Sequence, residues 1–305
     1  MRPIFALVFL FSFPLHARPH NYIVGGQDVQ APDPIAALTV GIFTPSPDGH
    51  NGSLCTGTLI RKDIAVTAAH CLATGGLKPV VIFGRDLHSP MAVQRQSVAV
   101  AVNPKWRTNA GSGMDQGDIA LVKFPGGLPP GYKKASLARG EVHNGDSITL
   151  AGYGINDARS KSGAGTLRQA DVRVVDARVK KSEMILDQSH GRGACHGDSG
   201  GPAFLRRGRR VVLAGVTNRG YPNHAPDDCG HQVVYSKIPA YRSWIQRREK
   251  SLGTQAGRGL SMLKHKFKQP PKTRFTRRRN RPEAKLRHRS HVRQKRRKSV
   301  PANNR

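Results

Sequence analysis

Short apolar segments separated by turn-forming residues recur along most of this chain of 305 residues. They lie at residues 38–43, 59–66, 80–83, 97–102, 119–124, 147–151, 211–216 and 232–235. Gly, Pro, Asn and Asp cluster between them, which is the pattern of β-strands joined by tight turns. Apolar residues fall at helical spacing most clearly around residues 238–248. The sequence therefore predicts an all-β fold that ends in one helix.

The N-terminal segment predicts export. Met1-Arg2 gives a positively charged start, an apolar run of 12 residues follows at 4–15, and Ala17 supplies a small residue. Because a membrane span takes about 20 apolar residues, this run is too short for a stable anchor and is typical of a signal peptide. A buried strand or helix is the alternative. We therefore expect a signal peptide at residues 1–17 and a secreted or periplasmic protein.

The four cysteines are Cys55, Cys71, Cys195 and Cys229, which allow three pairings if all are bridged. An exported chain meets an oxidising environment, so disulfides are expected. Zinc is the other common use of four cysteines, but the chain has no Cys-x-x-Cys spacing. The sequence therefore predicts neither a metal site nor a cofactor.

Positive charge is concentrated at the C-terminal end. The formal net charge of the chain is +31, and residues 250–305 hold 20 Lys and Arg against one acid, a net charge of +19. Apolar residues are sparse there, so we expect residues 249–305 to form a disordered basic tail. Leu260, Leu263 and Phe267 have the spacing of a short amphipathic turn. Such a tail attracts polyanions and anionic surfaces, and a solvated extension without a partner is the alternative.

Three short motifs contain the residue types that a nucleophilic serine needs. They are Thr-Ala-Ala-His-Cys at 67–71, Asp-Ile-Ala-Leu at 118–121 and Cys-His-Gly-Asp-Ser-Gly-Gly-Pro at 195–202. A serine hydroxyl is a weak nucleophile until a base removes its proton, and His70 can act as that base near neutral pH. Asp118 would orient the imidazole, as in the general Ser-His-Asp template. The glycines around Ser199 leave room for backbone N–H groups to point at a developing oxyanion.

The segment at residues 197–201 also fits the Gly-x-Ser-x-Gly elbow of α/β-hydrolases. In that fold the serine precedes its acid and its histidine in the chain, whereas here His70 and Asp118 come before Ser199. The short strands without intervening helices also oppose an α/β fold. The order of the motifs therefore favours the His-Asp-Ser arrangement.

These motifs together resemble the trypsin/chymotrypsin family. Its members carry Ile-Val-Gly-Gly at the start of the mature domain, and this sequence stands here at 23–26, followed at suitable separations by the three motifs above. The resemblance covers residues 23–248. It implies a serine endopeptidase with polypeptide substrates, built from two six-stranded antiparallel β-barrels with the active site in the cleft between them. It also implies the disulfides Cys55–Cys71 and Cys195–Cys229.

The resemblance implies a maturation step as well. Cleavage before Ile23 would free an α-amino group that pairs with the carboxylate of Asp198, since burying either charge alone is costly. This pair would shape an oxyanion hole made by the N–H groups of Gly197 and Ser199. The expected propeptide is residues 18–22, whose last residue is a tyrosine rather than the Arg or Lys that a tryptic activator needs.

The same resemblance addresses specificity. In this family the residue six before the nucleophile lies at the base of the primary pocket, and here it is Gly193, followed by Ala194. Without an acid at this base, a buried substrate Lys or Arg would lack a partner, which argues against tryptic specificity. The other expected pocket residues are Asn218, Arg219, Gly220 and Val233. We expect a preference for small or medium apolar side chains. The arginine at 219, where relatives have tryptophan, indicates a changed neighbouring subsite that could favour acidic residues.

A second class of function is compatible with the sequence. It is a cationic polyanion- or membrane-binding protein that keeps a protease fold for other ends. Such proteins usually have a damaged triad or oxyanion loop, whereas both are intact here. The sequence therefore favours a secreted serine endopeptidase whose basic tail localises it.

Overall fold

The computed structural model describes residues 23–48, 50–72, 77–109, 116–207, 210–222 and 229–266, with side chains described outside 107–109 and 254–266. The signal peptide and propeptide expected at 1–22, and the tail from 267 onward, lie outside the described residues. The chain divides into two units, Met1–Ser261 and Met262–Arg305. All contacts described below belong to the first unit.

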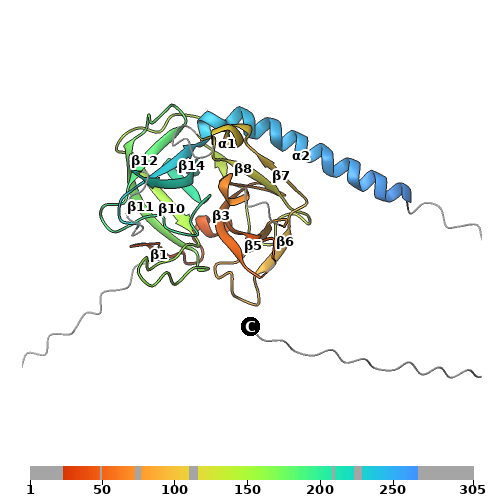
Figure 1. Cartoon of the computed structure of the whole chain (residues 1–305), viewed down its shortest axis with the longest axis horizontal. Coiled ribbons are helices and arrows are strands. Elements are labelled where there is room, and N and C mark those ends of the chain that lie inside the picture. The colour runs from red at the N-terminus through yellow and green to blue at the C-terminus, as the bar shows by residue number, and fades with distance from the viewer. Residues whose placement is uncertain are drawn as a thin grey trace, which may run out of the picture. The chain divides into compact units, whose positions relative to one another are not determined.

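The first half of the chain forms an antiparallel seven-stranded sheet with the order β6-β5-β2-β3-β4-β8-β7 (Figure 1). Its strands are β2 (Thr39–Pro45), β3 (Gly52–Arg61), β4 (Ile64–Thr67), β5 (Val80–Phe83), β6 (Val93–Gln96), β7 (Ala99–Val102) and β8 (Ala120–Lys123). Every residue of β4 and β8 is buried. Their Ile, Val, Leu and Thr side chains suit such a packed, pleated surface. The sheet therefore has a buried centre from which the neighbouring loops extend.

The second half forms a closed barrel. Its strands follow the order β11-β10-β13-β14-β15-β12, and β12 pairs back with β11. They are β10 (Ser147–Gly152), β11 (Arg168–Asp176), β12 (Glu183–Asp187), β13 (Pro202–Arg207), β14 (Arg210–Tyr221) and β15 (Gln232–Lys237), with β1 (Gln27–Asp28) added to β11 and β9 (Ser136–Leu137) to β14. The expected all-β fold is confirmed. It consists of a closed six-stranded barrel and an open seven-stranded sheet.

The C-terminal helix is longer than the sequence analysis predicts. Besides the short helices η1 (Pro34–Ala37), η2 (His70–Leu72) and α1 (Pro104–Asn109), the structure has α2 (Ile238–Lys266). The helix therefore continues past residue 248, into the segment expected to be disordered. Leu252 accounts for the first turn of this extension, because it is 2% exposed and packs into the same core cluster as Trp244 and Ile245. No helix in the described ranges is both long and apolar enough to cross a membrane.

Several strands differ from the expected segments. The apolar segment at 59–66 is two strands, β3 and β4, joined by a turn at Lys62 and Asp63. The strands β11, β12 and β13 are absent from the expected set. In β11 buried residues alternate with more exposed polar ones, so it has no continuous apolar run. A search for apolar runs misses such a strand, whereas a search for period-two alternation finds it.

One buried tyrosine joins the two halves of the fold. Tyr153 follows β10 of the closed barrel and is fully buried. Its hydroxyl donates to the backbone oxygen of Gly84, next to β5, at 2.8 Å and lies 3.2 Å from the backbone oxygen of Thr39 in β2. Its own backbone N–H donates to the side chain of Thr56 in β3 at 3.1 Å. These contacts fix the edge of one barrel against the other.

Replacing Tyr153 by Phe removes this hydroxyl and leaves the partly buried Gly84 oxygen without its donor. We expect Tyr153→Phe to lower the free energy of unfolding by about 1–3 kcal/mol. The control is Tyr221→Phe, at a tyrosine that is 39% exposed, with an expected change near zero. Urea unfolding of both variants, on a Ser199→Ala background that prevents self-digestion, measures the difference. Equal effects of the two substitutions would contradict the role assigned to Tyr153.

Candidate active site

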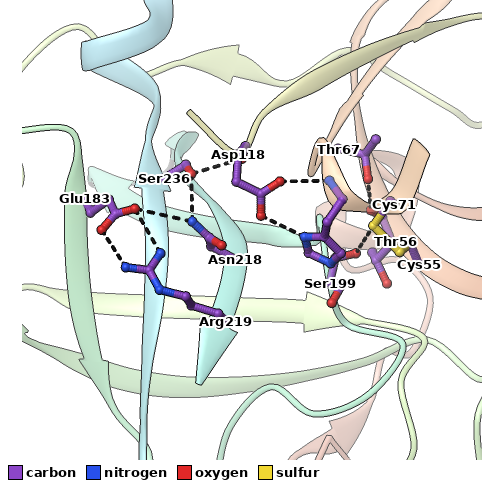
Figure 2. Close-up of polar contacts among 11 residues, drawn as sticks. Cys55, Thr56, Thr67, Cys71, Asp118, Glu183, Ser199, Asn218, Arg219 and Ser236 are labelled. Atoms are coloured by element: carbon purple, nitrogen blue, oxygen red, sulfur yellow. Dashed lines mark hydrogen bonds and ion pairs between the residues drawn. A yellow bond between two sulfur atoms is a disulfide. The ribbon is translucent and has the colours of Figure 1, made fainter. Parts of the chain in front are cut away.

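The pairing of β4 with β8 brings His70 and Asp118 together. The two strands are antiparallel with Thr67 opposite Ala120, so the end of β4 lies beside the beginning of β8. His70 begins η2 just after β4, and Asp118 lies just before β8. The Asp118 carboxylate accepts the backbone N–H of His70 at 2.9 Å through Oδ1, and its Oδ2 lies 2.7 Å from His70 Nδ1 (Figure 2).

The carboxylate and the imidazole lie in different surroundings. The Asp118 side chain is completely buried, whereas the His70 side chain is 31% exposed. Ser236, in β15 of the other barrel, donates through Oγ to the backbone oxygen of Asp118 at 3.0 Å. This bond fixes the backbone of Asp118, while the carboxylate itself, which has lost water, is compensated by its contacts with His70. The contact through Nδ1 leaves the opposite ring nitrogen of His70, Nε2, directed away from Asp118 and suited to exchange a proton.

The loop that carries Ser199 is anchored to the first sheet. It precedes β13 of the closed barrel, yet Thr56 in β3 donates its backbone N–H to the Ser199 oxygen at 2.8 Å and its hydroxyl to the Gly197 oxygen at 2.9 Å. The Ser199 oxygen also lies 3.6 Å from the sulfur of Cys71, the residue after His70. The loop thus holds a partly exposed serine beside Cys71, the residue that follows His70.

The expected oxyanion donors lie in the same loop. Gly197 has a φ of +95°, and a Cβ there would lie 2.8 Å from the Cα of Gly154, so this position suits only glycine. In the described part of the chain, neither the N–H of Gly197 nor that of Ser199 donates to another protein group. Both N–H groups are therefore available to a ligand.

The base of the expected pocket is packed against a buried glutamine. Gln188 accepts the N–H of Ala194 at 2.7 Å and donates to the Ala194 and Cys229 oxygens at 3.1 Å each. A Cβ on Gly193 would lie 2.1 Å from Gln188 Cδ, so no side chain fits there while Gln188 keeps its place. Further along the expected pocket, Gly220 stands opposite Val233 in the pairing of β14 with β15.

The side chains of the other two expected pocket residues have different contacts. Arg219 makes two bonds of 2.9 Å with the buried carboxylate of Glu183. Asn218 is also buried and lies between Glu183 and Asp118 (Figure 2). The charge of Arg219 is thus already paired within the protein, which counts against the expected preference for acidic substrate residues.

The comparison with known families shows which family the chain belongs to. A family model described as trypsin matches residues 23–245, which include every residue described above as part of the site. The chain belongs to the trypsin family. It is accordingly a serine endopeptidase.

Individual relatives of this trypsin-family chain agree with the assignment. It is 35% identical over 218 residues to a trypsin-like protease of Streptomyces glaucescens, with 65% of this chain and 75% of that protein covered. It is 26% identical over 204 residues to brachyurin of Leptuca pugilator, with 63% and 86% covered. Among solved structures, neuropsin, a serine protease expressed in the limbic system of mouse brain, matches 73% of this chain and 98% of its own length. The TM-score is 0.59 at 22% identity, which supports the fold.

Both disulfides expected from the family resemblance are present. Cys55 is bonded to Cys71, beside His70, and Cys195 to Cys229, beside the pocket base. Two groups of Cys and His lie close enough to hold a metal ion, each around one of these disulfides. Because their sulfurs are bonded to each other, neither group offers the thiolates that zinc prefers.

The N-terminal segment of the trypsin-family domain lies against the pocket loop. Ile23 is 1% exposed, and Val24 pairs with Gly193, whose N–H donates to the Val24 oxygen at 2.8 Å. The buried carboxylate of Asp198 accepts the N–H groups of Gly154 at 2.8 Å and Cys195 at 2.9 Å. Burial raises the pKa of Asp198 to about 6, although these two donors lower it. In the uncleaved chain, burial thus makes the ionised form of Asp198 less favourable than it is in water.

Several residues that support the site were not predicted from the sequence. Thr56, Gln188, Ser236 and Glu183 make the contacts described above, but none lies in the three motifs that contain His70, Asp118 and Ser199. One feature of the sequence indicated Glu183. It is an acid at the start of the apolar segment Glu-Met-Ile-Leu. An arginine in place of a pocket tryptophan needs such a partner, so the two together could have indicated a buried ion pair.

The raised pKa of Asp198 predicts a pH-dependent stability of the uncleaved chain. The pKa of Asp198 in the folded protein lies above its unfolded value of 3.8. The contribution of the protonated Asp198 to the free energy of unfolding is therefore fully present below pH 3.8 and is lost as the pH rises through about 6. We expect this loss to be on the order of 2–3 kcal/mol between pH 4 and 7.5.

The measurement compares Asp198 with Asp198→Asn in uncleaved Ser199→Ala protein by urea unfolding across this pH range. The difference in the free energy of unfolding should shift in favour of the Asn variant as the pH rises. A difference that stays constant with pH would contradict the assignment of this carboxylate.

Proposed function

We propose that this protein hydrolyses peptide bonds with His70, Asp118 and Ser199 as its catalytic triad. The observation that carries the proposal is the completely buried Asp118 carboxylate, 2.7 Å from His70 Nδ1, beside the anchored loop of Ser199. Trypsin-family membership supports the same reaction. A histidine fixed in this way presents Nε2 as a base.

The reaction follows from the positions of these groups. His70 Nε2 takes the proton of Ser199 as its Oγ attacks the peptide carbonyl, and the imidazolium is stabilised by Asp118. The N–H groups of Gly197 and Ser199 bind the oxyanion of the tetrahedral intermediate. His70 then gives its proton to the leaving amine, which leaves an acyl ester on Ser199. Water, deprotonated by His70, attacks this ester and releases the acid product.

Maturation and specificity are part of the proposal. Cleavage before Ile23 would create an ammonium group that pairs with Asp198, relieving the buried carboxylate and fixing the oxyanion loop. Gly193, Ala194, Gly220 and Val233 would line the primary pocket, and none of these four described residues is an acid. Small or medium apolar side chains, such as Ala or Val, fit this lining best.

The proposal also includes export and attachment. Residues 1–17 would act as a signal peptide, and disulfides such as the two found here are typical of exported proteins. The basic segment 250–305 would hold the enzyme on a polyanion or an anionic surface. Since Leu252 is part of the core, a truncation that examines the tail alone should begin after Lys266.

Cleavage of a mixed peptide library by protein that begins at Ile23 tests the proposal. We expect cuts after Ala, Val and similar residues, and a loss of at least about 10⁴-fold in kcat for Ser199→Ala. Cuts after Lys or Arg would overturn the pocket assignment while keeping the enzyme. Folded protein with a free Ile23 that shows no Ser199-dependent cleavage would overturn the proposed function itself.

A further inference from the structure

A buried ion pair lies next to the catalytic aspartate. Arg219 in β14 faces Glu183 in β12, with Nη1–Oε1 and Nη2–Oε2 distances of 2.9 Å each (Figure 2). The Glu183 side chain is 1% exposed and that of Arg219 is 19% exposed. A two-pronged contact of this kind fixes the orientation of the guanidinium as well as its position.

Asn218 connects this ion pair to the triad. The Asn218 amide can be placed with its nitrogen toward Asp118. In this orientation the amide nitrogen lies 2.7 Å from Asp118 Oδ2, and the amide oxygen lies 3.0 Å from Arg219 Nη1. In the opposite orientation, drawn in Figure 2, the nitrogen has only two contacts of 3.5 Å, with Glu183 and Ser236. The amide oxygen would then face the Asp118 carboxylate, which is repulsive. Electrostatics therefore selects the first orientation.

In this orientation the contacts form a continuous chain from Glu183 to His70. Glu183 fixes Arg219, whose N–H donates to the Asn218 oxygen, and the Asn218 nitrogen donates to Asp118 Oδ2. The same Oδ2 atom is the partner of His70 Nδ1. Because the charge of Arg219 is balanced by Glu183, the pair orients the amide without adding a net charge beside Asp118.

We propose that Asn218 is a positioning residue for the triad, held in its working orientation by the Glu183–Arg219 ion pair. Its N–H keeps Asp118 Oδ2 directed at His70 and compensates the carboxylate for lost water. The inference rests on the proposed peptidase reaction. It adds three residues that act on the reaction through Asp118 without touching the substrate's reacting atoms.

The test separates a positioning role from a purely structural one. Asn218→Leu keeps the size of the side chain but removes the donor, and Asn218→Ser restores a hydroxyl donor. Glu183→Gln weakens the hold on Arg219 and leaves the Asn218 side chain itself in place. The matched control is Glu249→Gln, because Glu249 forms an ion pair with Arg61 at 3.7 Å outside the triad network.

Losing one hydrogen bond to a buried charge should lower kcat by about 10- to 100-fold in Asn218→Leu. We expect KM to change by less than about threefold, Asn218→Ser to recover most of kcat, and Glu183→Gln to lose a smaller part of it. The downfield proton resonance of His70 Nδ1–H should shift or broaden in Asn218→Leu and Glu183→Gln. It should stay unchanged in Glu249→Gln.

An unchanged kcat in Asn218→Leu, or a rise in KM alone, would overturn the inference. If Asn218→Leu does not fold, wild-type kcat and an unshifted His70 resonance in Glu183→Gln would overturn it instead. A wild-type protein without Ser199-dependent hydrolysis would refute the proposed reaction. The His70 resonance would still show whether Asn218 and Glu183 control the histidine contact.

Discussion

The completely buried carboxylate of Asp118 is the constraint on which the rest of the site depends. A carboxylate without water is tolerated only where the protein supplies donors in its place. The backbone and ring of His70 supply two of these contacts, and the amide of Asn218 faces the same carboxylate. The antiparallel pairing of β4 with β8 makes the first two possible, because it places the two loops at one edge of the sheet.

Both halves of the fold contribute residues to the site. Ser236 and Asn218 reach Asp118 from β15 and β14, while Thr56 of β3 reaches back to the loop that carries Ser199. Each half of the fold thus fixes a reactive group of the other. Tyr153 adds a further contact between the halves, so the geometry of the site depends on how the two barrels are packed together.

The motifs of the sequence predicted the family and the fold class, because each motif is a short local pattern. The two disulfides followed from the family resemblance, since the residues alone left three pairings open. Strand β11 was missed since its buried residues alternate with more exposed ones. The helix beyond residue 248 was missed since Leu252, which is buried, is an isolated apolar residue in a polar stretch of the sequence. The Glu183–Arg219 pair was not predicted, because the two residues are 36 positions apart in the chain and meet only through the closed barrel. An arginine at a pocket position and an acid beside an apolar segment were its signs in the sequence.

The most direct test of this account is to locate the residue that a fluorophosphonate modifies in protein beginning at Ile23. Mass spectrometry of the digested protein should find one adduct, on Ser199, formed rapidly at neutral pH. Substitution of His70 by Ala should slow its formation by several orders of magnitude. An adduct on another serine, or labelling of Ser199 at the same rate without His70, would contradict the triad on which the account rests.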